Sequence, residues 1–494
     1  MLARSKLFFK LRTSLFTQVR CFSNQITVNQ ADSLPEPEVL LTEYGELVNV
    51  KPMKRSKNPY ERSYKEVFMI DDNSSVRVIM KVLSHNKNCY FLFDPEGAHY
   101  TNSMSIYRAI RKKVFERYYG MNRIKADTVS NKNAFSKCKT PLDIFHRERN
   151  VRLNISQELG RIGYLVEKDF SLRIKGQNRP ELKTLAQVIP EQAGLYKPLN
   201  DYKKSDYFLP SNMLYGMISS EEWEKNGIEI LTLDNHMIYP LYGVWSPTTQ
   251  THLSLLDLFM KSLPDPSQIN NVIDIGCGTG ILGILAGKYG TSGELIGIDN
   301  FENAVECTKI NSQVHGLGTK LKPILFDLTT LYHNKALFKE SGITDLQAKP
   351  SLNTPSFIKE QMMYKKVINQ LGMPSKYDLI LANPPWLPAS KLPEINPLDN
   401  GVYDPEEVFL KSSLNFARLH LSPEKRGRML LIYSDLAQII GLQKKNRIED
   451  LIHSAGLFID EVYETPMALS KKPYDPLVNY KAEAKVQMFE ICKA

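Results

Sequence analysis

The stretch NVIDIGCGTGILGILAGKYG, residues 271–290, decides the fold class of this chain. A short apolar run (271–276) enters a glycine-rich turn, and a run with helical composition follows without a break. A buried strand that leads through glycines into a helix is typical of parallel α/β sheets. We therefore predict an α/β fold built around this stretch.

Outward from it, strand-like and helix-like runs alternate to the end of the sequence. Further strands are predicted at 294–299, 320–327, 377–383, 428–435, 457–465 and 485–491, and helices at 302–316, 405–421 and 447–456. This alternation indicates βαβ units and a mostly parallel sheet. Ligands of such sheets bind beyond the carboxyl ends of the strands, so polar residues there are candidates for a site.

The first strand end carries an acid and a run of glycines. Asp274 precedes Gly276, Gly278, Thr279 and Gly280. Glycines let the backbone approach a ligand closely, but this spacing is not the G-x-G-x-x-G of dinucleotide sites. The acid would also repel a pyrophosphate, which disfavours a nucleotide-dependent oxidoreductase. A nucleoside that bears an amino acid and a cationic centre suits the acid better.

The second and third strand ends carry one acid each. Asp299 follows Asp274 by 25 residues, close to the spacing at which a carboxylate binds ribose hydroxyls. Asp327 is placed to accept a hydrogen bond from an adenine amino group. A single acid at a strand end is often only solvated or caps a helix, but the order of the two acids after the glycine turn favours ligand binding.

The fourth strand end is Asn383-Pro384-Pro385-Trp386. In combination, DIGCGTG (274–280), GIDN (297–300), FDL (326–328) and YDLILANPPW (377–386) resemble the class I S-adenosylmethionine-dependent methyltransferases. Within that class they are similar to the small-domain group, which includes release-factor glutamine methyltransferases and ribosomal-RNA guanine-N2 methyltransferases. The adenine-N6 enzymes share N-P-P-aromatic. The resemblance extends over about 240–494.

The resemblance implies a Rossmann-like, seven-stranded methyltransferase domain at 236–494, with S-adenosylmethionine as cofactor and no metal. It assigns cofactor binding to Asp274, Gly276, Gly278, Thr279, Gly280, Asp299, Asp327 and Asn383. It also places the segment YGVWSPTT (242–249) over the cofactor. Tyr242 and Thr249 are candidates there, although capping of the next helix explains Thr249 equally well.

Such enzymes methylate a nitrogen conjugated to a planar group, whose lone pair is a poor nucleophile. The Asn383 side-chain oxygen and the Pro384 carbonyl can accept the N–H bonds of that nitrogen, and Pro384 and Pro385 stiffen the loop. Trp386 can stack on a flat base or amide. We therefore expect these four residues to be catalytic through positioning and electrostatics. The alternative is a proline turn after a buried strand, with Trp386 in the core.

Two parts of the chain depart from the family pattern. Residues 328–375 form an insertion whose composition suggests a surface excursion near the target site. Residues 61–235 are predicted to be a mixed, mainly helical domain for substrate recognition, with strands at 75–83 and 89–93 and a helix at 105–120.

The segment 108–149 is basic. It holds 12 Lys and Arg residues against 4 acids, with aromatic residues between them. Phosphate neutralisation and stacking on aromatic side chains are how structured RNA is bound, so contact with ribosomal RNA is one expectation. A solvated helical face is the other.

The first residues have the composition of a mitochondrial presequence. Residues 1–31 contain five bases and no acid, with apolar residues at helical spacing, and Arg20-Cys21-Phe22-Ser23 resembles a matrix processing site. We therefore expect residues 1–22 to direct the protein to the mitochondrial matrix and 23–60 to be a linker. The alternative is an unstructured basic N-terminus.

Composition limits the class of protein to which this chain can belong. The chain has 494 residues, 42% hydrophobic and 24% charged, with a net charge of +9, which is ordinary globular composition for two or three domains. No apolar run is long enough to span a membrane, and no cysteine pair has C-x-x-C spacing.

Two functions remain open on these grounds. One is a mitochondrial N-methyltransferase that acts on an RNA base or on a glutamine amide of a translation factor. The other is an inactive methyltransferase-fold scaffold or assembly factor of the mitochondrial ribosome.

Overall fold

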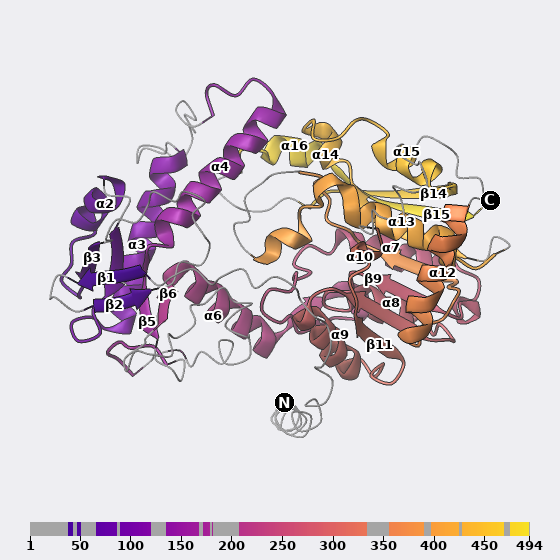
Figure 1. Ribbon diagram of the computed structural model, residues 1–494, viewed down its shortest axis with the longest axis horizontal. Helices are drawn as coiled ribbons and strands as arrows, with labels where there is room; N and C mark the ends of the chain where they lie inside the picture. The colour runs from indigo at the N-terminus through magenta and orange to yellow at the C-terminus, as the bar shows by residue number, and fades with distance from the viewer. Residues whose placement is uncertain are drawn as a thin grey trace.

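The computed structural model describes residues 38–42, 47–50, 66–85, 89–119, 135–166, 171–177, 180, 207–332, 355–389, 397–423, 427–468 and 475–493. An N-terminal and a C-terminal region, each built on its own sheet, lie at opposite ends of the long axis (Figure 1). The predicted presequence, 1–22, lies outside the described residues. Among the described helices, none is both long and apolar enough to cross a membrane.

The C-terminal region contains a seven-stranded sheet in the order β11-β10-β9-β12-β13-β15-β14. Its strands are β9 (Val272–Ile275), β10 (Leu295–Asp299), β11 (Leu321–Leu325), β12 (Leu379–Ala382), β13 (Arg428–Ser434), β14 (Leu457–Pro466) and β15 (Lys485–Lys493). The first five are parallel, and β15 runs antiparallel to both of its neighbours. All seven predicted strands are present, and the α/β prediction is confirmed.

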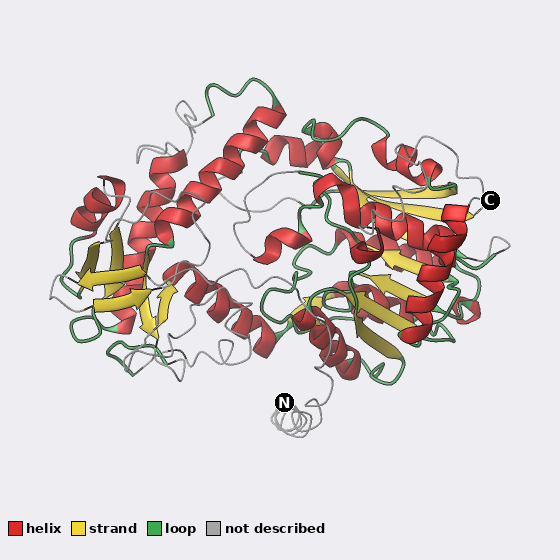
Figure 2. Cartoon of the chain, viewed as in Figure 1, coloured by secondary structure: helices red, strands yellow, loops and turns green. Residues whose placement is uncertain are grey.

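Helices cover both faces of this sheet (Figure 2), which is why its central strands are buried throughout and lack alternation. One core cluster joins the sheet to α7 (Thr251–Ser262) and α8 (Ile281–Lys288). The other joins it to α12 (Pro355–Gln370), α13 (Val408–His420) and α15 (Arg447–Ser454). The remaining helices of this region are α9 (Glu302–Val314), α10 (Thr329–Tyr332), α14 (Leu436–Ile439) and α16 (Val478–Glu483).

The N-terminal region is mixed, as predicted, and its helices pack with a sheet that the sequence pattern indicated only at 89–93. Its six-stranded sheet, in the order β2-β1-β3-β4-β5-β6, consists of β1 (Glu38–Thr42), β2 (Leu47–Val50), β3 (Glu66–Ile70), β4 (Cys89–Phe93), β5 (Ile162–Val166) and β6 (Tyr207–Pro210). Its helices are α2 (Val76–His85), α3 (Tyr100–Tyr119), α4 (Pro141–Leu159) and α6 (Ser211–Asn226). The strands have only four or five residues, too few for their pattern to stand out.

Two local expectations need correction. The segment 75–83, expected as a strand, forms α2, because its buried residues Ile79 and Leu83 are four apart while Val78 is 61% exposed. Part of the expected linker is sheet, since β1 pairs with β2 and lies parallel to β3. The strand at 89–93 and the helix over 105–119 are confirmed.

The second half of the 328–375 insertion is also not a surface excursion. It forms α12, whose Tyr364 and Ile368 are buried in the core cluster that contains the inner strands. Tyr364 accepts a hydrogen bond from the Asn415 side chain on α13. This helix therefore covers the sheet as a regular crossover between β11 and β12. Residues 333–354 of the insertion lie outside the described part.

Candidate functional site

The site lies at the carboxyl edge of β9, where the strand order reverses. Ile275, the last residue of β9, is paired with Ile298 of β10 on one side and with Ala382 of β12 on the other. The residues that follow these three positions therefore meet at one edge of the sheet: the glycine turn, Asp299 and Asn383. A crevice at such a reversal is the usual ligand site of an open α/β sheet.

The glycine turn needs glycine for its backbone. Gly276, Gly278 and Gly280 have φ values of +73°, +54° and +78°. A Cβ on Gly276 would lie 2.9 Å from the Phe409 ring, and one on Gly280 would lie 2.9 Å from Thr308. A Cβ on Gly278 would meet only a carbonyl oxygen at 4.0 Å. The tip of the turn thus leaves space on the protein surface for a ligand.

Asp299 closes one side of this space. Its carboxylate accepts hydrogen bonds from the Gly278 N–H at 3.0 Å and the Phe301 N–H at 3.0 Å. Burial raises its pKa, and these N–H donors oppose the rise. The side chain is half-buried, so a carboxylate oxygen has lone pairs left to accept ligand hydroxyl groups.

Asp327 lies two residues beyond β11 and is half-buried. Its Oδ1 accepts from the Thr329 N–H at 2.9 Å and the Thr329 hydroxyl at 2.7 Å. This carboxylate therefore caps the turn that opens α10, one of the two roles expected for a strand-end acid.

Asp274 is turned away from the ligand space. Its side chain lies within the protein, 1% exposed, and its Oδ2 accepts from the Gly283 N–H of α8 at 3.1 Å. Its Oδ1 is buried without a hydrogen-bond partner, and burial raises its pKa to about 7. Thr279 is buried as well, and its carbonyl accepts from the Asn311 amide. These two residues support the turn from behind.

Asn383 and Trp386 are hydrogen-bonded to each other. The indole Nε1–H donates to the Asn383 Oδ1 at 3.0 Å. Because an indole can only donate, this bond fixes which side of the amide carries the oxygen. Trp386 packs against both core clusters, and Pro384 is buried. The Trp386 ring therefore fits the alternative expectation, a position in the core, better than the expectation of a surface on which a target stacks.

The segment 402–409 completes the site, and sequence reasoning missed it. The buried Asp404 accepts from the backbone N–H groups of Phe409 and Leu410 at 2.9 Å each and so begins α13. Glu406 and Glu407 have positive φ values of 62° and 58°. This strained turn brings the Phe409 ring against Gly276. The only sequence signal was an acid with Pro405 before a helical run.

The segment 242–249 lies across the neighbouring strand ends. The Gly243 backbone faces the Phe301 ring, and the Tyr242 carbonyl accepts from the Asn303 amide at 3.0 Å. Trp245 lies against Gly401 and remains 50% exposed. Thr249 precedes α7 by two residues, and its role over the cofactor stays a prediction.

The basic segment is only partly available to a ligand. Tyr119, Phe135 and Phe145 are buried, and Tyr119 stacks on the rings of Phe115 and Phe135. These aromatic side chains pack within the protein, which removes them as stacking partners for bases. Several exposed bases of α3 remain on the surface, namely Arg108, Arg111, Lys112 and Arg117. Residues 120–134 lie outside the described part.

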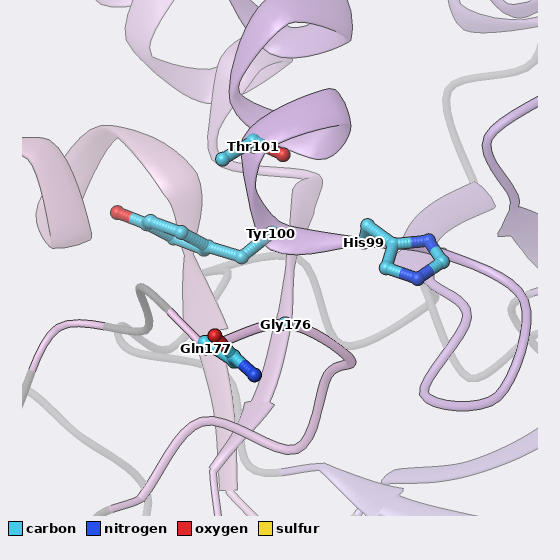
Figure 3. A pocket seen from close by; sticks show the side chains of 5 residues that line it. All are labelled: His99, Tyr100, Thr101, Gly176 and Gln177. Atoms are coloured by element: carbon cyan, nitrogen blue, oxygen red, sulfur yellow. The ribbon is translucent and has the colours of Figure 1, made fainter.

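A separate hollow of about 570 Å³ lies in the N-terminal region, lined by His99, Tyr100, Thr101, Gly176 and Gln177. Figure 3 shows the rings of His99 and Tyr100 pointing to opposite sides of the backbone. His99 pairs with Asp72 at 2.6 Å. The hollow therefore lacks the converging polar groups of a typical ligand site. Over the described residues, no cluster of three or more His, Cys, Asp or Glu side chains suits a metal ion.

The donor set at the β9 edge fits S-adenosylmethionine. An open glycine tip and the half-buried Asp299 carboxylate provide hydrogen-bond acceptors and negative charge, which repel phosphate and suit ribose hydroxyls and a cationic ligand. Asp299 would hold the ribose hydroxyls, and the turn would face the amino-acid part.

Comparisons with known proteins point the same way for part of the chain. A family model described as ribosomal protein L11 methyltransferase (PrmA) matches residues 241–336, from the segment before α7 to just beyond Asp327. The relatives include ribosomal protein L11 methyltransferases of Ruminiclostridium cellulolyticum, 33% identical over 166 residues, and of Thermotoga neapolitana, 30% identical over 124 residues. These alignments cover 32% and 20% of this chain and 49% and 44% of the relatives. The chain thus spans about half the length of the relatives it matches.

The ribosomal protein L11 methylase of Lactobacillus delbrueckii subsp. bulgaricus is 16% identical with a TM-score of 0.29, over 55% of this chain and 92% of that one. TrmN from Thermus thermophilus is 15% identical with a TM-score of 0.27, over 49% and 48%. The strand order of the C-terminal sheet gives an α/β fold of the methyltransferase type, and residues 241–336 are similar to ribosomal protein L11 methyltransferases.

Proposed function

We propose that this chain is an S-adenosylmethionine-dependent N-methyltransferase that acts on a macromolecule of the translation apparatus. The bound cofactor supplies a methyl group on a sulfonium. The relationship of residues 241–336 to methyltransferases supports the reaction class, and the acid-rich glycine turn supports the cofactor.

The position of Asn383 is the observation that favours a nitrogen atom as the acceptor of the methyl group. This residue lies directly beyond β12, beside the glycine turn, and Trp386 holds its oxygen in one orientation. An amide oxygen has two lone pairs, so one remains to accept an N–H bond from the target. That bond favours a nitrogen whose own lone pair faces the methyl group. The residue thus acts through preorganised position rather than proton transfer.

For the acceptor, we propose a nitrogen of a ribosomal protein, because the relatives are described as ribosomal protein L11 methyltransferases. An RNA base is the second candidate. It is favoured by the exposed bases Arg108, Arg111 and Lys112 of α3, which can neutralise phosphates. The N-terminal region lies outside residues 241–336, the part that the family model matches. We propose that this additional region recognises either acceptor.

We also propose that the protein acts in the mitochondrial matrix. The acid-free, basic composition of residues 1–22 supports this location.

A methyl-transfer assay tests the function. Purified protein and tritium-labelled S-adenosylmethionine are added to mitochondrial ribosomes from cells that lack the gene, with Asn383→Ala protein in parallel. Label in protein with wild type alone supports the ribosomal-protein target, and label in RNA supports the second candidate. Absence of label in both fractions, with the cofactor still bound, would make the chain a scaffold.

A further inference from the structure

A buried ion pair joins the two regions of the molecule beside the proposed target site. Arg149, on α4 of the N-terminal region, donates through Nη2 to Asp399 Oδ2 at 2.6 Å. Their side chains are only 7% and 10% exposed. The guanidinium also lies over the Tyr403 ring, 4.5 Å from its centroid. Removing one partner of such a pair leaves an uncompensated charge in a desolvated site.

Asp399 and Tyr403 belong to the segment that holds the Asn383–Trp386 loop. The Val402 and Tyr403 N–H groups donate to the Asp399 carbonyl at 3.0 and 2.9 Å. Leu387, the residue after Trp386, donates to the Val402 carbonyl at 3.1 Å and accepts from the Asp404 N–H at 2.9 Å. The loop is therefore attached by backbone hydrogen bonds to the segment that Arg149 binds.

The same segment reaches the glycine turn. Asp404 fixes the start of α13, and this places the Phe409 ring against Gly276. One buried side chain from the N-terminal region is thus connected to both the target loop and the cofactor turn.

Helix α4 is a firm support for Arg149. It begins with a capping box in which Thr140 and Asp143 exchange hydrogen bonds. Glu148 accepts from the Tyr119 hydroxyl at 2.9 Å and from Arg152 at 2.6 Å, which ties α4 to α3. Phe145, near the start of α4, joins a small hydrophobic cluster with C-terminal residues, including Ala389 at the end of the 383–389 loop. Figure 1 shows α4 extending from the N-terminal region toward α14 and α16.

We propose that Arg149 is a positioning residue for methyl transfer: it holds the 383–389 loop in its working geometry through Asp399 and Tyr403. The proposal rests on the proposed function for its effect on turnover, but the mechanical link can be measured without activity. It also makes the N-terminal region part of the active site rather than only a substrate-binding attachment.

Hydrogen exchange tests the link. Arg149→Met keeps an unbranched apolar stem and removes the charged guanidinium. We expect peptides containing Leu387 and Asp404 to exchange about tenfold faster, because local opening becomes easier. Arg428→Met is the matched control, since Arg428 makes a 2.6 Å pair with the buried Glu490 at the other end of β13. Asp399→Asn, with nearly unchanged volume, is the second variant, and circular dichroism checks that all variants fold.

Steady-state kinetics test the consequence. For Arg149→Met, S-adenosylmethionine affinity should stay within about threefold while kcat falls by about tenfold or more, as expected for a misplaced reacting group. Arg149→Lys should recover part of kcat. The proposal would be overturned if the peptides containing Leu387 and Asp404 exchanged no faster in Arg149→Met than in Arg428→Met. It would also be overturned if they exchanged faster while kcat stayed unchanged. If the wild type transfers no methyl group, the proposed function fails, and unchanged exchange in Arg149→Met would still separately refute the link.

Discussion

At the scale of single residues, the pair formed by Asn383 and Trp386 is the most informative feature of the site. The indole donates to the one oxygen that a target nitrogen would use, and its ring packs on the core. In the proposed function, Trp386 would act on the target through Asn383, and the two residues should be tested together.

Asn383→Ala should separate catalysis from cofactor binding. Loss of one preorganised acceptor at the reacting centre should lower turnover by on the order of 10²-fold. S-adenosylmethionine affinity, measured by calorimetry, should stay within about threefold, because Asn383 lies past the glycine turn. Trp386→Phe keeps most of the ring and removes only the donor, so we expect a smaller loss, about tenfold. Equal turnover in all three proteins would remove Asn383 from the mechanism.

Asp274 should make stability depend on pH. Burial raises its pKa from an ordinary value of 3.8 to about 7, so the folded chain keeps a proton that the unfolded chain loses. Stability therefore falls as the pH rises from about 4 to about 7. Asp274→Asn keeps an acceptor for the Gly283 N–H and cannot titrate. Urea unfolding at pH 5 and pH 8 should show a smaller decrease for this variant than for wild type, and parallel decreases would contradict the assignment.

At the scale of elements, the turn between β9 and α8 is constrained in two ways, by its left-handed backbone and by close packing. The two constraints do not act at all of the same glycines. All three glycines have left-handed backbone, which costs a residue with a Cβ about 1–3 kcal/mol. Only Gly276 and Gly280 also face a side chain closely, whereas Gly278 faces open space. The turn is thus tightly packed at its ends and exposed at its tip.

Gly276→Ala should therefore destabilise the fold more than Gly278→Ala. Both substitutions carry the backbone strain, but only the first pushes on the Phe409 ring, where a Cβ would lie at 2.9 Å. Urea unfolding gives the free energy of each variant. Gly278→Ala should instead lose cofactor affinity out of proportion to its stability, since its Cβ would enter the proposed ligand space. The reverse order of the two effects would mean that the ligand lies elsewhere.

At the scale of the whole molecule, two sheets are joined at α4, and the joint lies beside the target loop rather than far from it. The described residues of the 108–149 segment therefore include bases in two different environments. Its buried members, such as Arg149, connect the regions, while exposed bases of α3 stay available to a polyanion.

The presequence prediction also concerns the whole chain. Residues 1–22 carry five bases and no acid, which suits import across a membrane that is negative inside. Mass spectrometry of the protein from isolated mitochondria should find Ser23, or a residue close to it, at the N-terminus. A cytosolic protein that begins at Met1 would contradict this location.

The sequence by itself determined the features that depend on neighbours along the chain. The seven C-terminal strands, the glycine turn and the positions of Asp299 and Asn383 at strand ends all follow from local pattern, because a strand, a left-handed turn and a helix start are encoded within a few residues. Where a local pattern fits two structures, the prediction was wrong, as it was for α2, and of the short strands of the N-terminal sheet only β4 was predicted.

Tertiary structure alone decided which way side chains face and which distant segments meet. Asp274 turns toward α8, Trp386 packs on the core, Phe409 covers Gly276, and Arg149 reaches Asp399 across 250 positions of sequence. Each of these contacts exists only after helices have packed on the sheet, because burial fixes side-chain orientation and long-range pairing together. Except for Asp274 and Gly283, which are nine positions apart, the partners of these contacts are too far apart to fall within one local window of sequence.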